Sequence, residues 1–210
     1  MSSAAIPSLE DFTRDAKSWL EENAEYRTSG TDDKDIVWGD GEFSVSVFHS
    51  LSFDEEQALL RRGMDWIQKK AEKGYHAITA PIEYGGLALP RAYSRAFSKL
   101  ESQFQTPTGH ETLSVTVGLI APTIELFGTP EQKSEYVARF MATRDLCCQL
   151  FSEPGAGSDL ASLACRADRD GDEWVLNGQK VWSSGAQFSA FGELIARSNV
   201  DIPKHKGMTA

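Results

Sequence analysis

The spacing of apolar residues changes near Asp145, and this change limits the folds that the chain can adopt. Before Asp145, apolar residues recur every three or four positions, as in amphipathic helices that pack together. After it come short apolar runs bounded by turn residues, such as LCCQLFS and FGELIARS, which are typical of strands. The sequence predicts an α+β protein, with an all-helical bundle at residues 1–145 and an antiparallel β domain at residues 146–210.

Helix starts are predicted where a capping residue precedes an apolar stripe. The patterns place them after Ser8, Ser52, Pro90 and Thr129. The first helix should bury one face, made of Leu9, Phe12, Ala16, Trp19 and Leu20. Pro122 should kink or break the apolar segment at residues 112–127, because proline lacks the N–H that a helix interior needs.

In the β domain, Asp170-Gly171 predicts a hairpin and Asn177-Gly178 a second turn. Strands are expected over ASLACRAD, residues 161–168, and along EWVLNGQKVW, residues 173–182. The 65 residues from 146 to 210 are few for a closed barrel of such short strands, so we expect this domain to be incomplete.

Composition excludes several classes of function. The chain has 31 acidic and 21 basic side chains with no basic cluster, so a nucleic-acid partner is not expected. No apolar run approaches the ~20 residues that span a bilayer, and the N-terminus lacks a signal pattern, which favours a cytoplasmic protein. The four histidines are far apart and the three cysteines form no CxxC pair, so no metal site is predicted.

The stretch SEPGAGSD, residues 152–159, is a glycine-rich turn with two possible roles. Gly155 and Gly157 can adopt positive φ and expose backbone amides, Ser158 adds a hydroxyl, and Asp159 can cap the turn. Such a turn can hold a phosphate or pyrophosphate, or it can be a plain loop between strands. It is not GxGxxG leading into a helix, which disfavours a dinucleotide-binding α/β unit.

A second segment, NGQKVWSSGAQFS, begins at Asn177 and places Trp182, Ser183 and Ser184 at the expected end of a strand. Trp182 alone would be read as a core aromatic. Together, the two segments resemble the acyl-CoA dehydrogenase family, in which an EPGAGSD turn followed by NGQKxW lies in the central β domain. The helical half is similar to the family's N-terminal domain more loosely, through APIEYGG at residues 80–86 and FGTPEQK at residues 127–133.

The resemblance implies a bound FAD and a set of residues around it. The implied cofactor-binding residues are Leu150, Phe151, Ser152, Gly157, Ser158, Trp182, Ser183 and Ser184. Ser158 would also touch the substrate, and the Ser184 hydroxyl would meet flavin N5. The chain departs from the family pattern at Gln149, where an aromatic is frequent, at Ser184, where threonine is common, and at Gly185-Ala186, where Asn-Gly is usual.

The implied reaction is the α,β-dehydrogenation of an acyl-CoA thioester, with electrons passing to an electron-transferring flavoprotein. The family's base is a glutamate of a C-terminal helical domain, which we do not find in these residues. We therefore assign no catalytic residue, and Glu153 is not given that role. The resemblance also implies a homo- or hetero-oligomer. Two other hypotheses stay open at this point: an acyl-CoA oxidase or flavin monooxygenase of the same fold, and a non-catalytic subunit of a flavoprotein complex.

Overall fold

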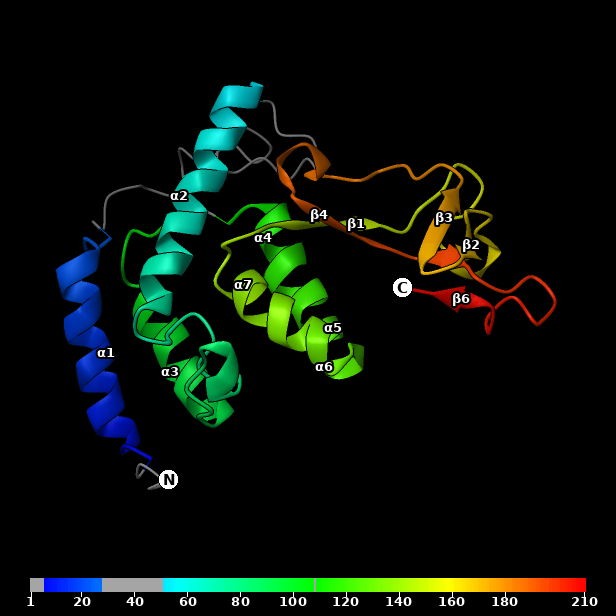
Figure 1. The fold of residues 1–210 in the computed structure, drawn as a ribbon. Coiled ribbons are helices and arrows are strands. Elements are labelled where there is room, and N and C mark those ends of the chain that lie inside the picture. Colours follow the sequence, from blue (N-terminus) through cyan, green and yellow to red (C-terminus); the bar gives the residue numbers. More distant parts are fainter. Residues whose placement is uncertain (1–5, 28–50, 108) are drawn as a thin grey trace.

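The computed structural model describes residues 6–27, 51–107 and 109–210. A group of helices lies at one end, a small sheet lies at the other, and the paired strands β1 and β4 run between them (Figure 1). The α-helices are α1 (Leu9–Asn23), α2 (Phe53–Ala71), α3 (Arg91–Glu101), α4 (Glu111–Val115), α5 (Ala121–Phe127), α6 (Pro130–Gln132) and α7 (Ala138–Met141). Shorter helical segments are the 3₁₀ turn η3 (Ile82–Tyr84) and the π-helical η4 (Thr116–Ile120) and η5 (Lys133–Val137). The expected helical region followed by a small sheet domain is confirmed.

The predicted helix starts are confirmed by their caps. The Ser8 hydroxyl accepts the N–H of Asp11 at 3.0 Å, which satisfies a donor that the first turn of α1 leaves free. Reciprocal capping boxes begin α2 at Ser52 and α6 at Thr129. These starts could be predicted because each cap involves residues only three positions apart.

The helical core is largely aromatic. Phe12 and Trp19 of α1 pack against the rings of Tyr93 and Phe97 in α3, with centroids 5.2 Å apart for Phe12 and Tyr93 and 6.5 Å apart for Trp19 and Phe97. All four are at least nine-tenths buried. Leu9 is 44% exposed, so its place in the predicted buried stripe is wrong. It stands at the first position of α1.

Pro122 does not break the helix in which it lies. Helix α4, the π segment η4 and α5 form one continuous run, and Ala121 donates its N–H five residues back to Thr116. A π turn is one way for a helix to accommodate the hydrogen bond that proline cannot make. The buried Thr116 hydroxyl donates to the carbonyl of Cys147 and accepts that residue's N–H, at 3.1 and 3.0 Å. This helix is thereby tied to the first strand.

The strands form two sheets. In the first, β1 (Cys147–Leu150) pairs with β4 (Phe191–Leu194). In the second the order is β3-β2-β5-β6, with bounds β2 (Arg166–Asp170), β3 (Glu173–Asn177), β5 (Ala196–Arg197) and β6 (Met208–Thr209).

Pairing is mixed, so the expectation of purely antiparallel strands is corrected in this detail. The β2–β3 hairpin, with Gly171 at φ +61°, and the β5–β6 pair are antiparallel as expected. The β1–β4 and β2–β5 pairs are parallel. Parallel pairing needs a connection of a dozen residues or more, and the long stretch between β1 and β4 meets that need.

Two expected strands are shorter than the sequence suggested. In place of a strand over residues 161–168, the 3₁₀ turn η6 (Leu160–Ser162) precedes β2. The N–H groups of Ala164 and Cys165 bond to the Glu153 side chain, at 2.6 and 2.9 Å, and so are not free for a ladder. Strand β3 ends at Asn177, and the next residue, Gly178, packs so closely on Cys165 that a Cβ atom at Gly178 would be 2.6 Å from the Cα of Cys165.

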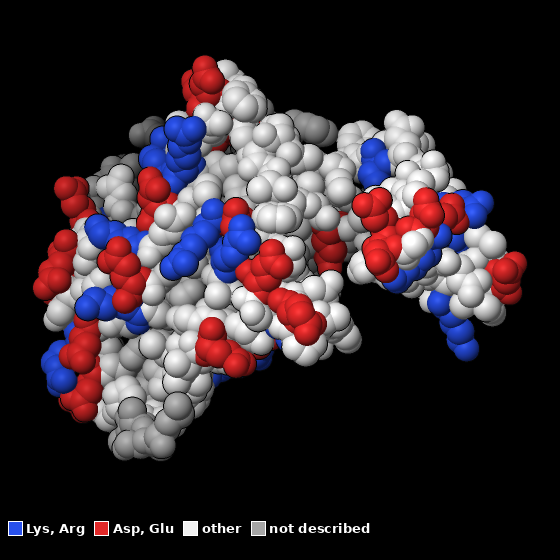
Figure 2. Space-filling view, in the orientation of Figure 1, with Lys and Arg blue, Asp and Glu red and all other residues white. Residues whose placement is uncertain are grey.

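Surface charge is interspersed. On the face drawn in Figure 2, basic and acidic side chains alternate over the helices and the small sheet, and they do not gather into one basic patch. Within the described ranges, no helix is both long and apolar enough to cross a bilayer. Nor do the described residues hold a cluster of three or more His, Cys, Asp or Glu side chains suited to a metal; His49 lies outside them.

Candidate functional site

The two motifs lie side by side in the fold. Val181 donates its N–H to the carbonyl of Ser152 at 2.9 Å, and Lys180 Nζ donates to the carbonyl of Phe151 at 3.0 Å. Residues 151–152 and 179–183 lie outside the strands. The prediction that Trp182, Ser183 and Ser184 end a strand is therefore wrong. They enter the 3₁₀ turn η7 (Ala186–Phe188), where Gly185 turns the chain with φ +75°.

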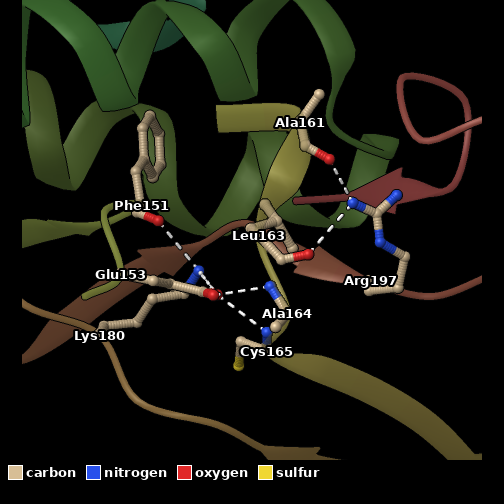
Figure 3. Close-up of polar contacts among 8 residues, drawn as sticks. All are labelled: Phe151, Glu153, Ala161, Leu163, Ala164, Cys165, Lys180 and Arg197. Atoms are coloured by element: carbon tan, nitrogen blue, oxygen red, sulfur yellow. Dashed lines mark hydrogen bonds and ion pairs between the residues drawn. The ribbon is translucent and has the colours of Figure 1, made fainter. Parts of the chain in front are cut away.

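A buried ion pair holds the motifs together. Lys180 Nζ lies 2.8 Å from Glu153 Oε1, and their side chains are only 8% and 7% exposed (Figure 3). The same carboxylate accepts the N–H groups of Ala164 and Cys165. Burial is the largest influence on the Glu153 pKa and raises it, but these hydrogen bonds and Lys180 outweigh it and leave the pKa below its ordinary value. Glu153 is thus a buried structural anion.

The turn beyond Glu153 is closed by its own backbone. Glu153 and Ala156 exchange two main-chain hydrogen bonds, of 2.8 and 3.1 Å. Neither Gly155 nor Gly157 is among the residues with positive φ, so the expected reason for these glycines is corrected. A Cβ atom built on either would meet nothing within 4 Å. The missing side chains leave open space beside the backbone, where a ligand can approach closely.

The turn continues into η6 through Ser158 and Asp159. Gly157 and Ser158 are both exposed. The Asp159 carbonyl accepts the N–H of Ser162 at 3.0 Å, and its carboxylate accepts the Ser162 hydroxyl at 2.5 Å and Lys204 Nζ at 2.7 Å. Asp159 therefore begins η6 and does not close the glycine turn, and its side chain makes no capping hydrogen bond to the backbone, so the expected cap is corrected.

The remaining predicted residues border the same region. Leu150, Phe151 and Ser152 are partly buried, whereas Trp182 is 74% exposed. Trp182 also has φ +58°, a left-handed conformation that is unfavourable for a bulky residue and recurs at functional sites. Its large exposed ring is the opposite of the core aromatic that Trp182 alone would suggest.

Ser184 sits where the loop meets the helices. It is partly buried, and within the described residues its hydroxyl makes no hydrogen bond, so it can bond to a ligand. The next residue, Gly185, is buried against Thr112 of α4. Among the described residues, the buried Thr112 hydroxyl has no hydrogen-bond partner. Close packing between loop and helix therefore sets the position of Ser184.

An apolar cleft of about 460 Å³ lies elsewhere, between α5 and the sheets. None of the eight predicted cofactor-binding residues lines it. It contains Glu193, whose pKa is raised by burial. We place the candidate site at the two motifs, because they bring an open glycine turn, free hydroxyls and an exposed ring together, whereas the cleft offers mainly apolar walls.

Sequence reasoning missed Lys180, Thr112 and Arg197. For Lys180 a signal was available, because the two motifs carry opposite charges at Glu153 and Lys180. Thr112 and Arg197 had no such signal, because they lie far along the chain from the residues that they contact.

Family models match both parts of the chain. Residues 49–144 match the acyl-CoA dehydrogenase N-terminal domain, and residues 148–210 match the acyl-CoA dehydrogenase middle domain. The chain belongs to the acyl-CoA dehydrogenase family. The resemblance read from the two motifs is confirmed.

Similar members of the family are known. Acyl-CoA dehydrogenase IpdE1 of Mycobacterium tuberculosis is 33% identical over 96% of this chain and 48% of its own length. Acyl-CoA dehydrogenase FadE34 of the same organism is 55% identical over 66% of this chain and 19% of its own length. The solved ChsE4-ChsE5 complex from Mycobacterium tuberculosis matches with a TM-score of 0.61 and 28% identity, over 99% of this chain and 46% of the matched chain. The chain spans about half the length of IpdE1 and of the matched ChsE4-ChsE5 chain, and about a fifth of the length of FadE34.

Proposed function

We propose that this chain takes part in the flavin-dependent α,β-dehydrogenation of an acyl-CoA thioester. The observation that carries the proposal is the joining of the two family motifs by the buried Glu153–Lys180 pair, with the open face of Gly157 and the exposed ring of Trp182 beside it. IpdE1 and FadE34 are both named acyl-CoA dehydrogenases, which supports the same class of reaction.

The residues present fit FAD. The open space at Gly157 would admit a pyrophosphate against the backbone, with the exposed Ser158 hydroxyl as a donor. Trp182 would pack beside the flavin ring, and the Ser184 hydroxyl would donate near N5. The other ring contacts would come from Leu150, Phe151, Ser152 and Ser183. FAD, when bound, supplies an acceptor for hydride.

Ser158 would also contact the substrate at the entry for CoA, since it stands exposed at the end of the turn. An electron-transferring flavoprotein would then accept the electrons, and the protein would act in an oligomer. We place no catalytic base in the chain. Glu153 is unsuited to that role, because its carboxylate already accepts two N–H groups and an ammonium. A base must be free to take a proton.

The first experiment tests the cofactor. The protein is purified under native conditions, and any bound flavin is released and identified by mass; stripped protein is then titrated with FAD, with FMN as control. Saturable binding that prefers FAD supports the proposal. A colourless protein that binds neither flavin contradicts it. Anaerobic bleaching of the bound flavin by an acyl-CoA, in the protein joined by any subunits that co-purify with it, tests the reaction.

A further inference from the structure

Arg197 is a buried cation at the end of β5. Its residue is only 9% exposed, and its backbone N–H donates to the carbonyl of Cys165 at 2.7 Å. The guanidinium faces three main-chain carbonyls: Lys204 at 2.6 Å, Ala161 at 2.5 Å and Leu163 at 3.2 Å. Figure 3 shows its contacts with the last two, beside the Glu153–Lys180 pair.

Burying the Arg197 guanidinium against these carbonyls costs free energy. Arginine keeps its charge at any ordinary pH, and a buried charge loses the hydration that water would provide. The acceptors are carbonyl dipoles and carry no net charge, so they offset only part of this loss. An apolar side chain of similar size would fill the same space without this loss of hydration. What the guanidinium adds is a fork of donors that can bind two segments at once.

One of these segments ends the glycine turn of the proposed site. Ala161 and Leu163 belong to the 3₁₀ turn η6 and the residue after it, directly downstream of Ser158. Within this turn Ser162 and Leu163 donate their N–H groups to the carbonyls of residues 159 and 160, both at 3.0 Å. Holding the carbonyls of Ala161 and Leu163 therefore holds the short closed turn that follows Ser158.

The other segment is the loop at residues 198–207. It closes tightly over Arg197, since a Cβ atom at Gly207 would lie 2.1 Å from the Asn199 carbonyl oxygen and 3.3 Å from a guanidinium nitrogen of Arg197. On the outside, Lys204 Nζ bonds Asp159 at 2.7 Å, but these two side chains are 47% and 58% exposed. Water and salt weaken such an exposed pair. The buried Arg197 is thus the stronger link between loop and turn.

We infer that Arg197 is a positioning residue for the cofactor turn: it fixes Gly157 and Ser158 by clamping the turn after them to the loop at residues 198–207. Arg197 touches neither cofactor nor substrate in this role. The connection to FAD rests on the proposed function, whereas the clamp itself rests on the contacts above.

Amide hydrogen exchange in Arg197→Ala tests the clamp. We expect exchange at residues 157–163 and 198–207 to accelerate by about tenfold or more, equivalent to ~1.4 kcal/mol, while amides of α1 and α3 keep their wild-type rates. Added guanidinium ion at low, non-denaturing concentration should slow this exchange again in Arg197→Ala. Lys204→Ala is the matched control, because it removes the exposed link alone, and guanidinium should not change its exchange. Wild-type exchange in Arg197→Ala, or no rescue by guanidinium, would overturn the clamp.

FAD affinity tests the connection to the cofactor. Arg197→Ala should bind FAD about tenfold more weakly than wild type, with recovery in guanidinium, and Arg197→Lys should fall between the two. If Arg197→Ala does not fold, Arg197→Lys carries both measurements, since it keeps the charge but cannot reach all three carbonyls. Faster exchange with unchanged FAD affinity would overturn the positioning role. If the wild-type protein binds no FAD, the proposed function fails, and the exchange data alone decide whether Arg197 clamps the turn.

Discussion

Gly185 and Thr112 are packed so closely that no side chain fits between them: a Cβ atom at Gly185 would lie 1.9 Å from Thr112 Oγ1. Gly185 also has φ +75°, which a residue with a side chain adopts at a cost of ~1–2 kcal/mol. The loop that carries Ser184 is therefore set against α4 at a position where only glycine fits.

Gly185→Ala should lower the free energy of unfolding by ~2–4 kcal/mol, from backbone strain and overpacking together. Urea denaturation measures this loss. Thr112→Ala in the same chain removes the obstructing hydroxyl and should recover ~1 kcal/mol. Gly118→Ala is the matched control, since a Cβ there meets nothing within 4 Å, and it should be neutral or stabilising. Equal stability of Gly185→Ala and the wild type would disprove the contact.

Lys180→Met should destabilise the fold by ~3–5 kcal/mol, because it leaves the Glu153 carboxylate buried without its counter-charge. Lys204→Met is the comparison, because it breaks an exposed pair and should cost under ~1 kcal/mol. Denaturant unfolding of the two variants gives the difference. Similar losses in both would mean that the Glu153–Lys180 pair contributes no more than a surface pair.

Gly157→Ala should leave the apoprotein as stable as wild type within ~0.5 kcal/mol, since its Cβ meets only open space. FAD binding should nevertheless weaken, and Gly157→Val should abolish it, because the added atoms occupy the approach to the backbone. Thermal unfolding and FAD titration separate the two effects, and Gly118→Ala should keep wild-type affinity. Full FAD occupancy in Gly157→Val would show that the turn is only structural.

Ser184→Ala removes the hydroxyl that we place near flavin N5. Reduction of the bound flavin by an acyl-CoA should slow by an amount equivalent to ~1–3 kcal/mol, without a change in folding. Stopped-flow absorbance of the flavin measures the rate, and a redox titration measures its potential. Ser184→Thr keeps the hydroxyl and should retain the wild-type rate. An unchanged rate and potential in Ser184→Ala would remove Ser184 from the site.

His76 makes stability depend on pH. Burial first, and then the charges of Lys70 and Arg144, lower its pKa from 6.5 to about 4. The unfolded chain therefore binds more protons than the folded protein between about pH 4 and 6.5, so stability should fall as pH falls through that range. The side chain in His76→Gln cannot titrate. The difference in urea midpoint between this variant and wild type, measured across the pH range, therefore separates the contribution of His76 from that of the carboxylates. A difference that does not vary with pH would contradict the lowered pKa.

Local patterns in the sequence were enough for much of the fold. The caps at Ser8, Ser52 and Thr129 and the hairpin at Asp170-Gly171 join residues only a few positions apart, so the sequence contains the whole interaction. The family resemblance placed both motifs in one β domain, and contacts such as that between Val181 and Ser152 agree with it.

The sequence by itself thus determined where helices give way to strands, where several helices begin, and which two motifs form the candidate site. Tertiary structure decided which strands pair in parallel, why residue 185 is glycine, and how Lys180 and Arg197 are used. The reason is physical: a cap or a turn depends on local geometry, whereas burial of a charge or close approach of a backbone depends on what distant segments place beside it. Glu153 shows the difference, because its place in the motif was visible, but its role came from the ammonium and the two N–H groups around it.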